Sequence, residues 1–478
     1  MDISKYFVAA PPITPVLNIG CLQDIPTGKY YKGRHGEHIL MGGLSRVEAV
    51  GGRGNMGKST LLFFRLLTAF RRYRKSLLNP YDTEDTLKFP RLNTLYQSIN
   101  EGMFLDLEET GRVLLTNNTV MTGNKWFLQF NQMAEDKKKN AKSMMGVTPF
   151  IHPKTGQNVE MIYPSLFGVD SLSQLMTDNV EEIFGKNEVG DSKANTVYMR
   201  GGNAKTQMLM QLPTITGQSN MFITLSMHVG DKIQMDQYNP NPKLLADMKA
   251  DTSFKNVPKN VTFLTNNLWY VFNSTVLQHR ETKTPLYPID SSSVVAGDTD
   301  LRIMQLQNLR AKNGPTGMPF ELVWSQRDGI LAGLSEYNFL KTHERYGIGG
   351  NDRTFYLELL PEVSLMRTTI RGKIDNDRRL RRALEITSEM LQMQLMWRDE
   401  HDVFCSPAEL RADLEKLGYD WDVLLSMTRG YWMFEDEAAE EPLQFLSTMD
   451  LLRMRKGLYI PYWKEIVNPY KVDKKKAG

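Results

Sequence analysis

Cysteine is almost absent from this chain, because Cys21 and Cys405 are the only two among 478 residues. Two cysteines cannot build a disulfide framework, and this scarcity fits a reducing compartment. Long apolar runs are missing too, and none approaches the roughly 20 residues of a membrane-spanning helix. The first residues lack the basic segment and apolar core of a signal peptide. We therefore expect a cytoplasmic protein (in the host cytoplasm if it is viral) with no membrane partner.

A marked excess of charge of either sign is also absent. Lysine and arginine total 58 against 55 aspartates and glutamates, for a formal net charge of +3. This balance neither demands nor excludes a nucleic-acid partner, so local clusters of charge have to decide. The apolar and charged fractions are those of an ordinary globular protein, and the length suits about two or three domains.

One glycine-rich segment is the most informative part of the sequence. It matches the pattern G-x-x-x-x-G-K-[ST], follows a predicted buried strand at Arg46–Val50, and precedes an apolar run at Leu61–Leu67 that predicts a helix. This strand, loop and helix context is what a phosphate loop requires, since backbone N–H groups and the helix N-terminus then face the phosphates. We expect ATP to be bound by Gly52, Arg53, Gly54, Asn55, Met56, Gly57, Lys58, Ser59 and Thr60.

Individual residues of the loop have separate expected roles. Lys58 would reach the β- and γ-phosphate oxygens, and Ser59 would be a ligand of Mg²⁺. A second residue of the metal site is expected at the end of a neighbouring strand, where Asp170 follows the apolar stretch 163–169. The alternative for Asp170 is a cap of the following helix.

Hydrolysis also requires a carboxylate that orients or deprotonates the attacking water. In this type of sheet it should follow the strand that comes after the phosphate-loop helix. Interpreting 93–97 as that strand makes Glu101 the candidate, with Glu108 and Glu109 as rivals. An exposed glutamate without a catalytic role is the alternative.

Two further groups complete the candidate site. The apolar stretch 221–228 predicts a buried strand with Ser226 and His228 near its end, where they could sense the γ-phosphate; a structural histidine is the alternative. Arg310 and Lys312 are spaced two residues apart on an extended segment and so project to the same side. They could act as a catalytic finger across a subunit interface. The alternative is that Arg310 and Lys312 belong to a basic turn at the surface.

The order of apolar segments predicts an α/β fold with a largely parallel central sheet over about 43–340. An N-terminal arm at 1–42, expected to take part in oligomerisation, precedes this core, and a mainly helical domain at 341–478 follows it. Two polar intervals, 177–205 and 229–262, are expected to be functional loops. The predicted strands are 46–50, 93–97, 112–116, 163–169, 221–228, 268–273, 301–306 and 320–324.

These elements, in this order, resemble the RecA/DnaB superfamily of DNA-dependent ATPases, and most closely the RecA-like (UvsX-type) phage recombinases. The phosphate loop, the Asp170-Ser171 strand end and the 221–228 strand carry the likeness, together with Thr14–Ile19 and Met41–Leu44. The resemblance implies a RecA-like P-loop core, ATP and Mg²⁺ as cofactors, and a homo-oligomer. It also places DNA-binding loops at 177–205 and 229–262.

On this resemblance we expect an ATP-dependent recombinase that forms filaments on single-stranded DNA and promotes strand exchange with duplex DNA. Lysines and tyrosines of the two loops would contact the DNA: Lys193, Lys205, Lys232, Lys243, Tyr198 and Tyr238. Arginines at 378–382 could capture duplex DNA, or form a solvated face. A DnaB-like hexameric helicase is the alternative, since the segment Arg310–Gly317 is similar to the trans-acting segment of those helicases. The third possible function is that of a non-catalytic loader.

Overall fold

The structure is a computed structural model that describes residues 11–463. It leaves out residue 12 and residues 102–104, 177–191, 233–240, 291, 293, 313, 352 and 397–401, and for 192–200 it describes the backbone only. No helix in the described part of the chain is long and apolar enough to cross a membrane.

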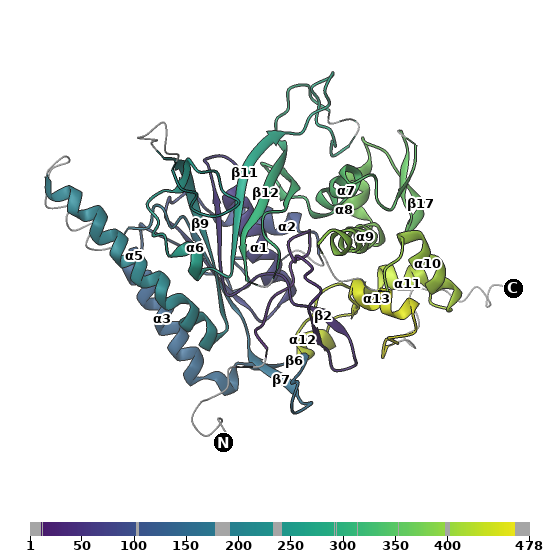
Figure 1. Ribbon diagram of the computed structural model, residues 1–478, viewed down its shortest axis with the longest axis horizontal. Coiled ribbons are helices and arrows are strands. Elements are labelled where there is room, and N and C mark those ends of the chain that lie inside the picture. The colour runs from purple at the N-terminus through teal and green to yellow at the C-terminus, as the bar shows by residue number, and fades with distance from the viewer. Residues whose placement is uncertain are drawn as a thin grey trace.

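A ten-stranded mixed sheet forms the centre of the molecule (Figure 1). Its order is β14-β13-β12-β11-β3-β9-β8-β4-β5, with β10 paired to β9. The six strands from β11 to β5 are parallel to their neighbours, whereas β12, β13 and β14 extend the sheet as antiparallel strands. The strands are β3 (Val47–Gly52), β4 (Leu77–Asp82), β5 (Thr116–Asn117), β8 (Ser165–Asp170), β9 (Met221–Asp231), β10 (Thr252–Phe254), β11 (Asn267–Val276), β12 (Leu301–Ala311), β13 (Pro319–Ser325) and β14 (Gly329–Ile330).

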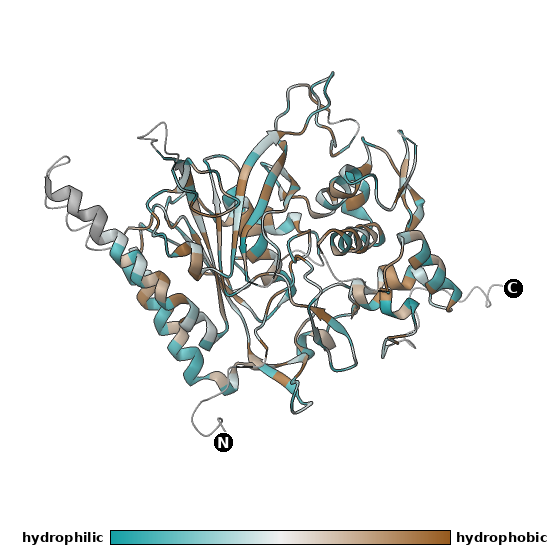
Figure 2. Cartoon of the chain, viewed as in Figure 1, coloured by the Kyte–Doolittle hydropathy of each residue, from teal (hydrophilic) through white to brown (hydrophobic). Residues whose placement is uncertain are grey.

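Helices cover both faces of this sheet, as a parallel sheet with apolar residues on both sides requires. One hydrophobic cluster joins α1 and α2 to one face, and a second joins α3, α5 and α6 to the other. Helices α3 and α5 lie side by side, and α5 extends beyond the body of the molecule (Figure 1), with hydrophilic residues along much of the pair (Figure 2). These helices are α1 (Lys58–Arg72), α2 (Phe89–Ser98), α3 (Gly123–Lys139), α5 (Ser192–Ser219), α6 (Val261–Leu264) and α7 (Ala332–Thr342), with a 3₁₀ turn at Ala141–Ser143.

The C-terminal part is mainly helical but also contains a small three-stranded sheet. A single hydrophobic cluster includes Ile13, α1 residues and Trp463, so the C-terminal part shares a continuous core with the first helix and the N-terminal segment. Its elements are β15 (Ile348–Gly350), β16 (Phe355–Leu357), β17 (Leu360–Leu365), α8 (Ile370–Asn376), α9 (Arg378–Met396), α10 (Pro407–Lys416), α11 (Trp421–Ser426), β18 (Thr428–Arg429), α12 (Glu435–Ala439), β19 (Gln444–Phe445) and α13 (Thr448–Arg455). Two hairpins lie outside the central sheet: β1 (Tyr30–Lys32) with β2 (His38–Leu40), and β6 (Met145–Ile151) with β7 (Asn158–Ile162).

The sequence located most of the central strands but was wrong about the one that follows α1. Residues 93–97 belong to helix α2, where Leu92, Leu95 and Tyr96 are buried at helical spacing. The strand after α1 is β4, which contains Pro80. A proline cannot donate a ladder hydrogen bond and so argues against a central strand. Here the Asn79 side chain donates to the Leu114 carbonyl at 2.5 Å and supplies a bond beside the proline.

A buried ion pair connects β3 to α1. The Arg65 guanidinium donates to Glu48 Oε2 from Nε and Nη2 at 3.0 and 2.7 Å, and both side chains are fully inaccessible to solvent. Arg65 also donates to Gln23 Oε1 at 2.6 Å and lies over the Trp269 ring. Glu48 accepts two more bonds, from Ser45 N and Asn267 Nδ2.

Removing one partner of this pair should destabilise the protein strongly. Arg65→Ala leaves the Glu48 carboxylate buried without its counter-charge, and we expect the free energy of unfolding to fall by about 3–5 kcal/mol in urea denaturation. The matched control is Lys88→Ala, which breaks an exposed pair with Asp85 and should cost at most about 0.5 kcal/mol. Equal losses from the two variants would show that the buried pair has no special role.

Candidate functional site

The candidate phosphate loop joins β3 to α1 at the carboxyl edge of the parallel strands. Lys58 is the first residue of α1, and Gly57 immediately before it has a left-handed conformation with φ of 83°. A Cβ on Gly57 would lie 2.6 Å from Met304 Cε and 3.1 Å from Trp324 Cζ2. Side chains of β12 and β13 therefore pack against the loop, and only glycine fits there.

Lys58 and Ser59 both point into the site. Lys58 Nζ donates to the Arg53 carbonyl at 2.7 Å, so the ammonium group folds over the loop. Burial lowers the pKa of Lys58, and the carboxylates Asp170 and Glu84 oppose that shift. Lys58 thus lies in a partly desolvated position beside two acidic groups, where a phosphate chain would find a strong donor.

Asp170 ends β8 and faces the loop. Its carboxylate accepts hydrogen bonds from the Ser59 and Ser226 hydroxyls. Burial raises the pKa of Asp170, and the two hydroxyl donors oppose the shift. The sequence predicted that Ser59 and Asp170 share a metal site, and the structure brings the two together. Capping of the next helix, the alternative role for Asp170, would not explain its contacts with Ser59 and Ser226.

A metal at this position would need the phosphates of a nucleotide as ligands. No group of three or more His, Cys, Asp or Glu residues able to hold a metal occurs in the described ranges of the chain. Mg²⁺ is commonly held by one or two protein oxygens together with substrate phosphates, and Ser59 with Asp170 fits that pattern.

Glu84 is the carboxylate that sequence reasoning missed. It follows β4, its side chain is about half exposed, and its Oε1 lies 3.4 Å from His228 Nε2. Asp82 holds the turn that carries it, by accepting bonds from the backbone N–H groups of Glu84, Thr86 and Leu87 at 2.9, 2.6 and 2.6 Å. The carboxylate was expected after the strand that follows α1, but the segment interpreted as that strand, 93–97, is part of helix α2.

Glu101 does not belong to this site, which corrects the sequence-based expectation. Its carboxylate pairs with Arg72, the last residue of α1, with Oε1 at 2.5 Å from Nη2. Because α1 has 15 residues, its two ends lie about 20 Å apart. Glu108 is an exposed residue and, with Glu109, lies in a turn that precedes the edge strand β5.

His228 lies on β9 beside Glu84, and its backbone N–H donates to Ser173 Oγ at 2.9 Å. The strand register places Ser226 opposite Val50 and His228 opposite Gly52, where the loop begins. Arg53 of the loop pairs with Asp231 at the end of β9. The loop is thereby connected to the strand whose following segment was predicted to bind DNA.

Arg310 and Lys312 lie at the opposite end of the strands from the phosphate loop. Arg310 is paired in register with Leu268, which aligns with Ala49 near the start of β3. Its guanidinium donates to the Thr265 and Phe263 carbonyls at 2.9 and 3.0 Å. These cations therefore cannot reach the phosphate loop of their own subunit, and a role across an interface stays a prediction.

The residues expected to contact DNA lie in different environments, and some of them are outside the described part of the chain. Lys205 is buried, and its Nζ donates to the Leu172 and Asn256 carbonyls at 2.9 and 3.1 Å, so it is not available to DNA. Burial lowers the pKa of Lys205 to about 8. Lys193 and Tyr198 lie on the part of α5 whose side chains are not described, and Tyr238 is outside the described residues. Residues 192–205, expected to be a loop, form the start of that helix.

No protein-family model matches this chain, and no curated protein matches its sequence. Inferences about function therefore depend on the residues of the site and their arrangement.

The conformation of Gly57 makes a direct test of the loop possible. Gly57→Ala puts a Cβ into a left-handed residue and against Met304 and Trp324, so the free energy of unfolding should fall by about 1–3 kcal/mol in urea denaturation. The control is Gly202→Ala, where a Cβ meets nothing within 4 Å. Since Gly202 lies in helix α5, alanine there should be neutral or stabilising. An unchanged stability for Gly57→Ala would contradict the described loop.

Proposed function

We propose that this chain is a P-loop ATPase of the RecA/DnaB superfamily. The observation that supports this best is the convergence of four strand ends at one edge of the sheet. The loop after β3, Glu84 after β4, Asp170 at the end of β8 and His228 on β9 meet there, although up to 170 residues separate them. In open α/β sheets, ligands bind at the carboxyl ends of the strands, where neighbouring connections leave in opposite directions.

In this proposal the loop backbone and Lys58 bind the phosphate chain of ATP, and Ser59 and Asp170 hold Mg²⁺. When bound, the metal ion neutralises phosphate charge. Lys58 would exchange its bond to the Arg53 carbonyl for phosphate oxygens. Such an exchange requires only a rotation of a side chain that already lies at the site.

Glu84 would orient or deprotonate the attacking water. Its side chain is about half exposed and is not hydrogen-bonded to a serine, which leaves room for a water molecule. His228 lies within contact of Glu84 and could report the state of the γ-phosphate to the segment after β9. Arg310 and Lys312 of an adjacent subunit would complete the site.

We further propose that the protein is a recombinase that forms filaments on single-stranded DNA. The connections after β8 and β9, which include residues 177–191 and 233–240, start at the same edge as the nucleotide site. Nucleotide contacts could therefore order them for DNA binding. Lys232 and Lys243, which donate to carbonyls of their own loop, remain candidates for phosphate contact. Lys205 does not.

The catalytic role of Glu84 can be tested by one substitution. Glu84→Gln keeps the shape of the side chain but removes its basicity, so ATP turnover should fall by about 10²–10⁴-fold, with ATP affinity changed little. Glu108→Gln, which alters an exposed glutamate outside the site, is the matched control and should retain full turnover. Normal turnover in Glu84→Gln would exclude Glu84 as the base.

The form of the assembly separates the recombinase from the helicase. With ATP and single-stranded DNA, electron microscopy should show filaments of variable length, and DNA should stimulate ATP turnover. Closed six-membered rings with unwinding activity would favour the DnaB-like helicase. Assembly that proceeds normally in Lys58→Ala, with no turnover in the unaltered chain, would instead favour a non-catalytic loader.

A further inference from the structure

A cavity of about 460 Å³ lies at the C-terminal end of α1, the end opposite the phosphate loop. Its walls come from the N-terminal segment near Ile19, the end of α1, the start of α9 and residues 428–431. Two exposed residues, Arg74 and Leu105, are among those that line it, so it reaches the surface. A cavity of this volume is within the range of small-molecule sites.

Positive charge predominates in this cavity. Eight arginines line it, against four glutamates. One of the four, Glu336, is fully buried, and burial together with Glu385 and Glu389 holds its pKa well above the usual range. Desolvation thus disfavours the charged form of one of the four glutamates.

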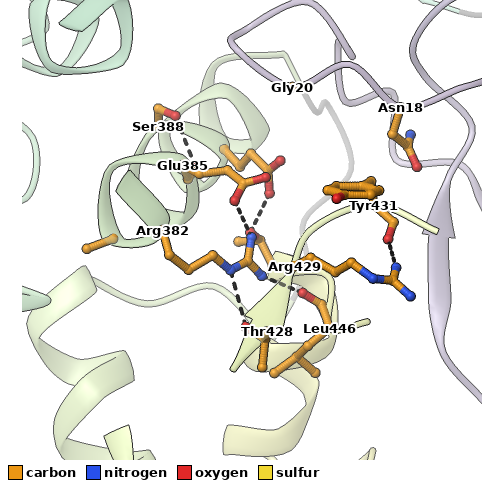
Figure 3. A network of polar contacts seen from close by, with 12 residues as sticks. Asn18, Gly20, Arg382, Glu385, Ser388, Thr428, Arg429, Tyr431 and Leu446 are labelled. Carbon is orange, nitrogen blue, oxygen red and sulfur yellow. Dashed lines mark hydrogen bonds and ion pairs between the residues drawn. The ribbon is translucent and has the colours of Figure 1, made fainter. Parts of the chain in front are cut away.

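Three of the eight arginines form ion pairs with carboxylates, and a fourth, Arg71, is held by carbonyl oxygens and an aromatic ring. Arg72 and Arg74 form ion pairs with Glu101 and Glu441. Arg382 pairs with Glu385 and also donates to Thr428 and to the Leu446 carbonyl (Figure 3). Arg71 donates to the Tyr96 carbonyl and lies over the Tyr96 ring. These contacts explain why four of the eight arginines are present without any ligand in the cavity.

Carbonyl oxygens accept the hydrogen bonds of the other four arginines, and Arg112 and Arg429 also lie over the rings of Phe70 and of Tyr431 and Phe445. Arg378 donates to the Ser426 and Thr428 carbonyls, and Arg381 to those of Ile374 and Asp375. Arg429 donates to the Tyr431 carbonyl (Figure 3). It also donates to the Leu443 carbonyl, and Arg112 donates to the carbonyls of Arg74 and Ser76. No carboxylate lies within ion-pair distance of any of these four in the described ranges.

The pKa of Arg72 shifts in the opposite direction from the pKa values of Arg378 and Arg381. Burial lowers the pKa of Arg72, but the charge of Glu101 more than offsets it and the pKa is raised. For Arg378 and Arg381, burial lowers the pKa, and the charges of Arg382 and Arg378, respectively, lower it further. The charges of Glu385 and Glu101 act in the opposite direction on the pKa of Arg378, and those of Glu101 and Asp375 on the pKa of Arg381, but do not restore it. Both guanidinium charges are therefore partly desolvated and lie near another cation.

We propose that this cavity binds a small anion with two or more phosphate groups. Guanidinium groups form forked, two-point hydrogen bonds to phosphate oxygens, and each has five N–H donors, more than the carbonyl contacts use. The walls come from several segments of the chain around a volume of about 460 Å³, which suits a compact phosphate chain rather than a nucleic-acid backbone that has to pass through. The bound anion would connect α1 to the C-terminal part of the chain. This site is separate from the phosphate loop and does not depend on the function proposed above.

Binding can be measured with the phosphate loop disabled. In the full chain carrying Lys58→Ala, titration calorimetry with inorganic tripolyphosphate should show one bound anion per chain. A parallel titration with ATP distinguishes recognition of the phosphate chain alone from recognition of a nucleotide. Adding Arg378→Gln or Arg381→Gln should weaken binding by at least about tenfold, the loss expected for a charge-assisted hydrogen bond. Arg280→Gln, at an exposed arginine outside the cavity, is the matched control and should leave it unchanged.

A second readout needs no substitution in the cavity. Phenylglyoxal modifies accessible arginines, and mass spectrometry follows each site separately. Tripolyphosphate should slow the modification of Arg378 and Arg381 in Lys58→Ala protein, but not that of Arg280. No binding at millimolar tripolyphosphate, binding that is insensitive to the cavity variants, or equal modification rates with and without the anion would each overturn the proposal.

Discussion

The buried ion pair between Glu48 and Arg65 is the constraint on which the rest of the site depends. It connects the strand and the helix on either side of the phosphate loop, so the two ends of the loop are held at a fixed separation. Its cost of desolvation is offset by four further contacts: Gln23, Ser45, Asn267 and the Trp269 ring. These partners come from the N-terminal segment and from β11, so distant parts of the chain hold the β3–α1 unit together.

Helix α1 lies between two regions of opposite charge. At its N-terminus, Lys58 and Ser59 meet a concentration of acidic side chains, including Asp170 and Glu84. At its C-terminus, Arg71 and Arg72 lie in a cavity with an excess of positive charge. Cations at a helix C-terminus also complement the helix dipole, which gives these two arginines a structural role in any case.

The sequence predicted the elements with strong local patterns and missed those without. β3, β8, β9, β11, β12 and β13 are apolar runs and were located to within a few residues. β4 was missed because Asn79 and Pro80 interrupt its apolar pattern, and its hydrogen bonding is completed by a side chain that only the fold brings near. Glu84 was missed with it. Lys205 was taken for a surface cation because its burial depends on α5 packing against the segments that contain Leu172 and Asn256.

The sequence by itself determined the phosphate-loop pattern, the α/β class of the core and the pairing of Ser59 with Asp170, because each of these depends on residue type and strand order. Only the tertiary structure decided which glutamate faces the loop, because Glu84 reaches the site through the pairing of β4 with β8, which places Asp82 opposite Asp170. It also decided where the uncompensated arginines gather. Arg112, Arg378 and Arg429 are far apart in the chain, and their charges meet only when the C-terminal part packs against the end of α1.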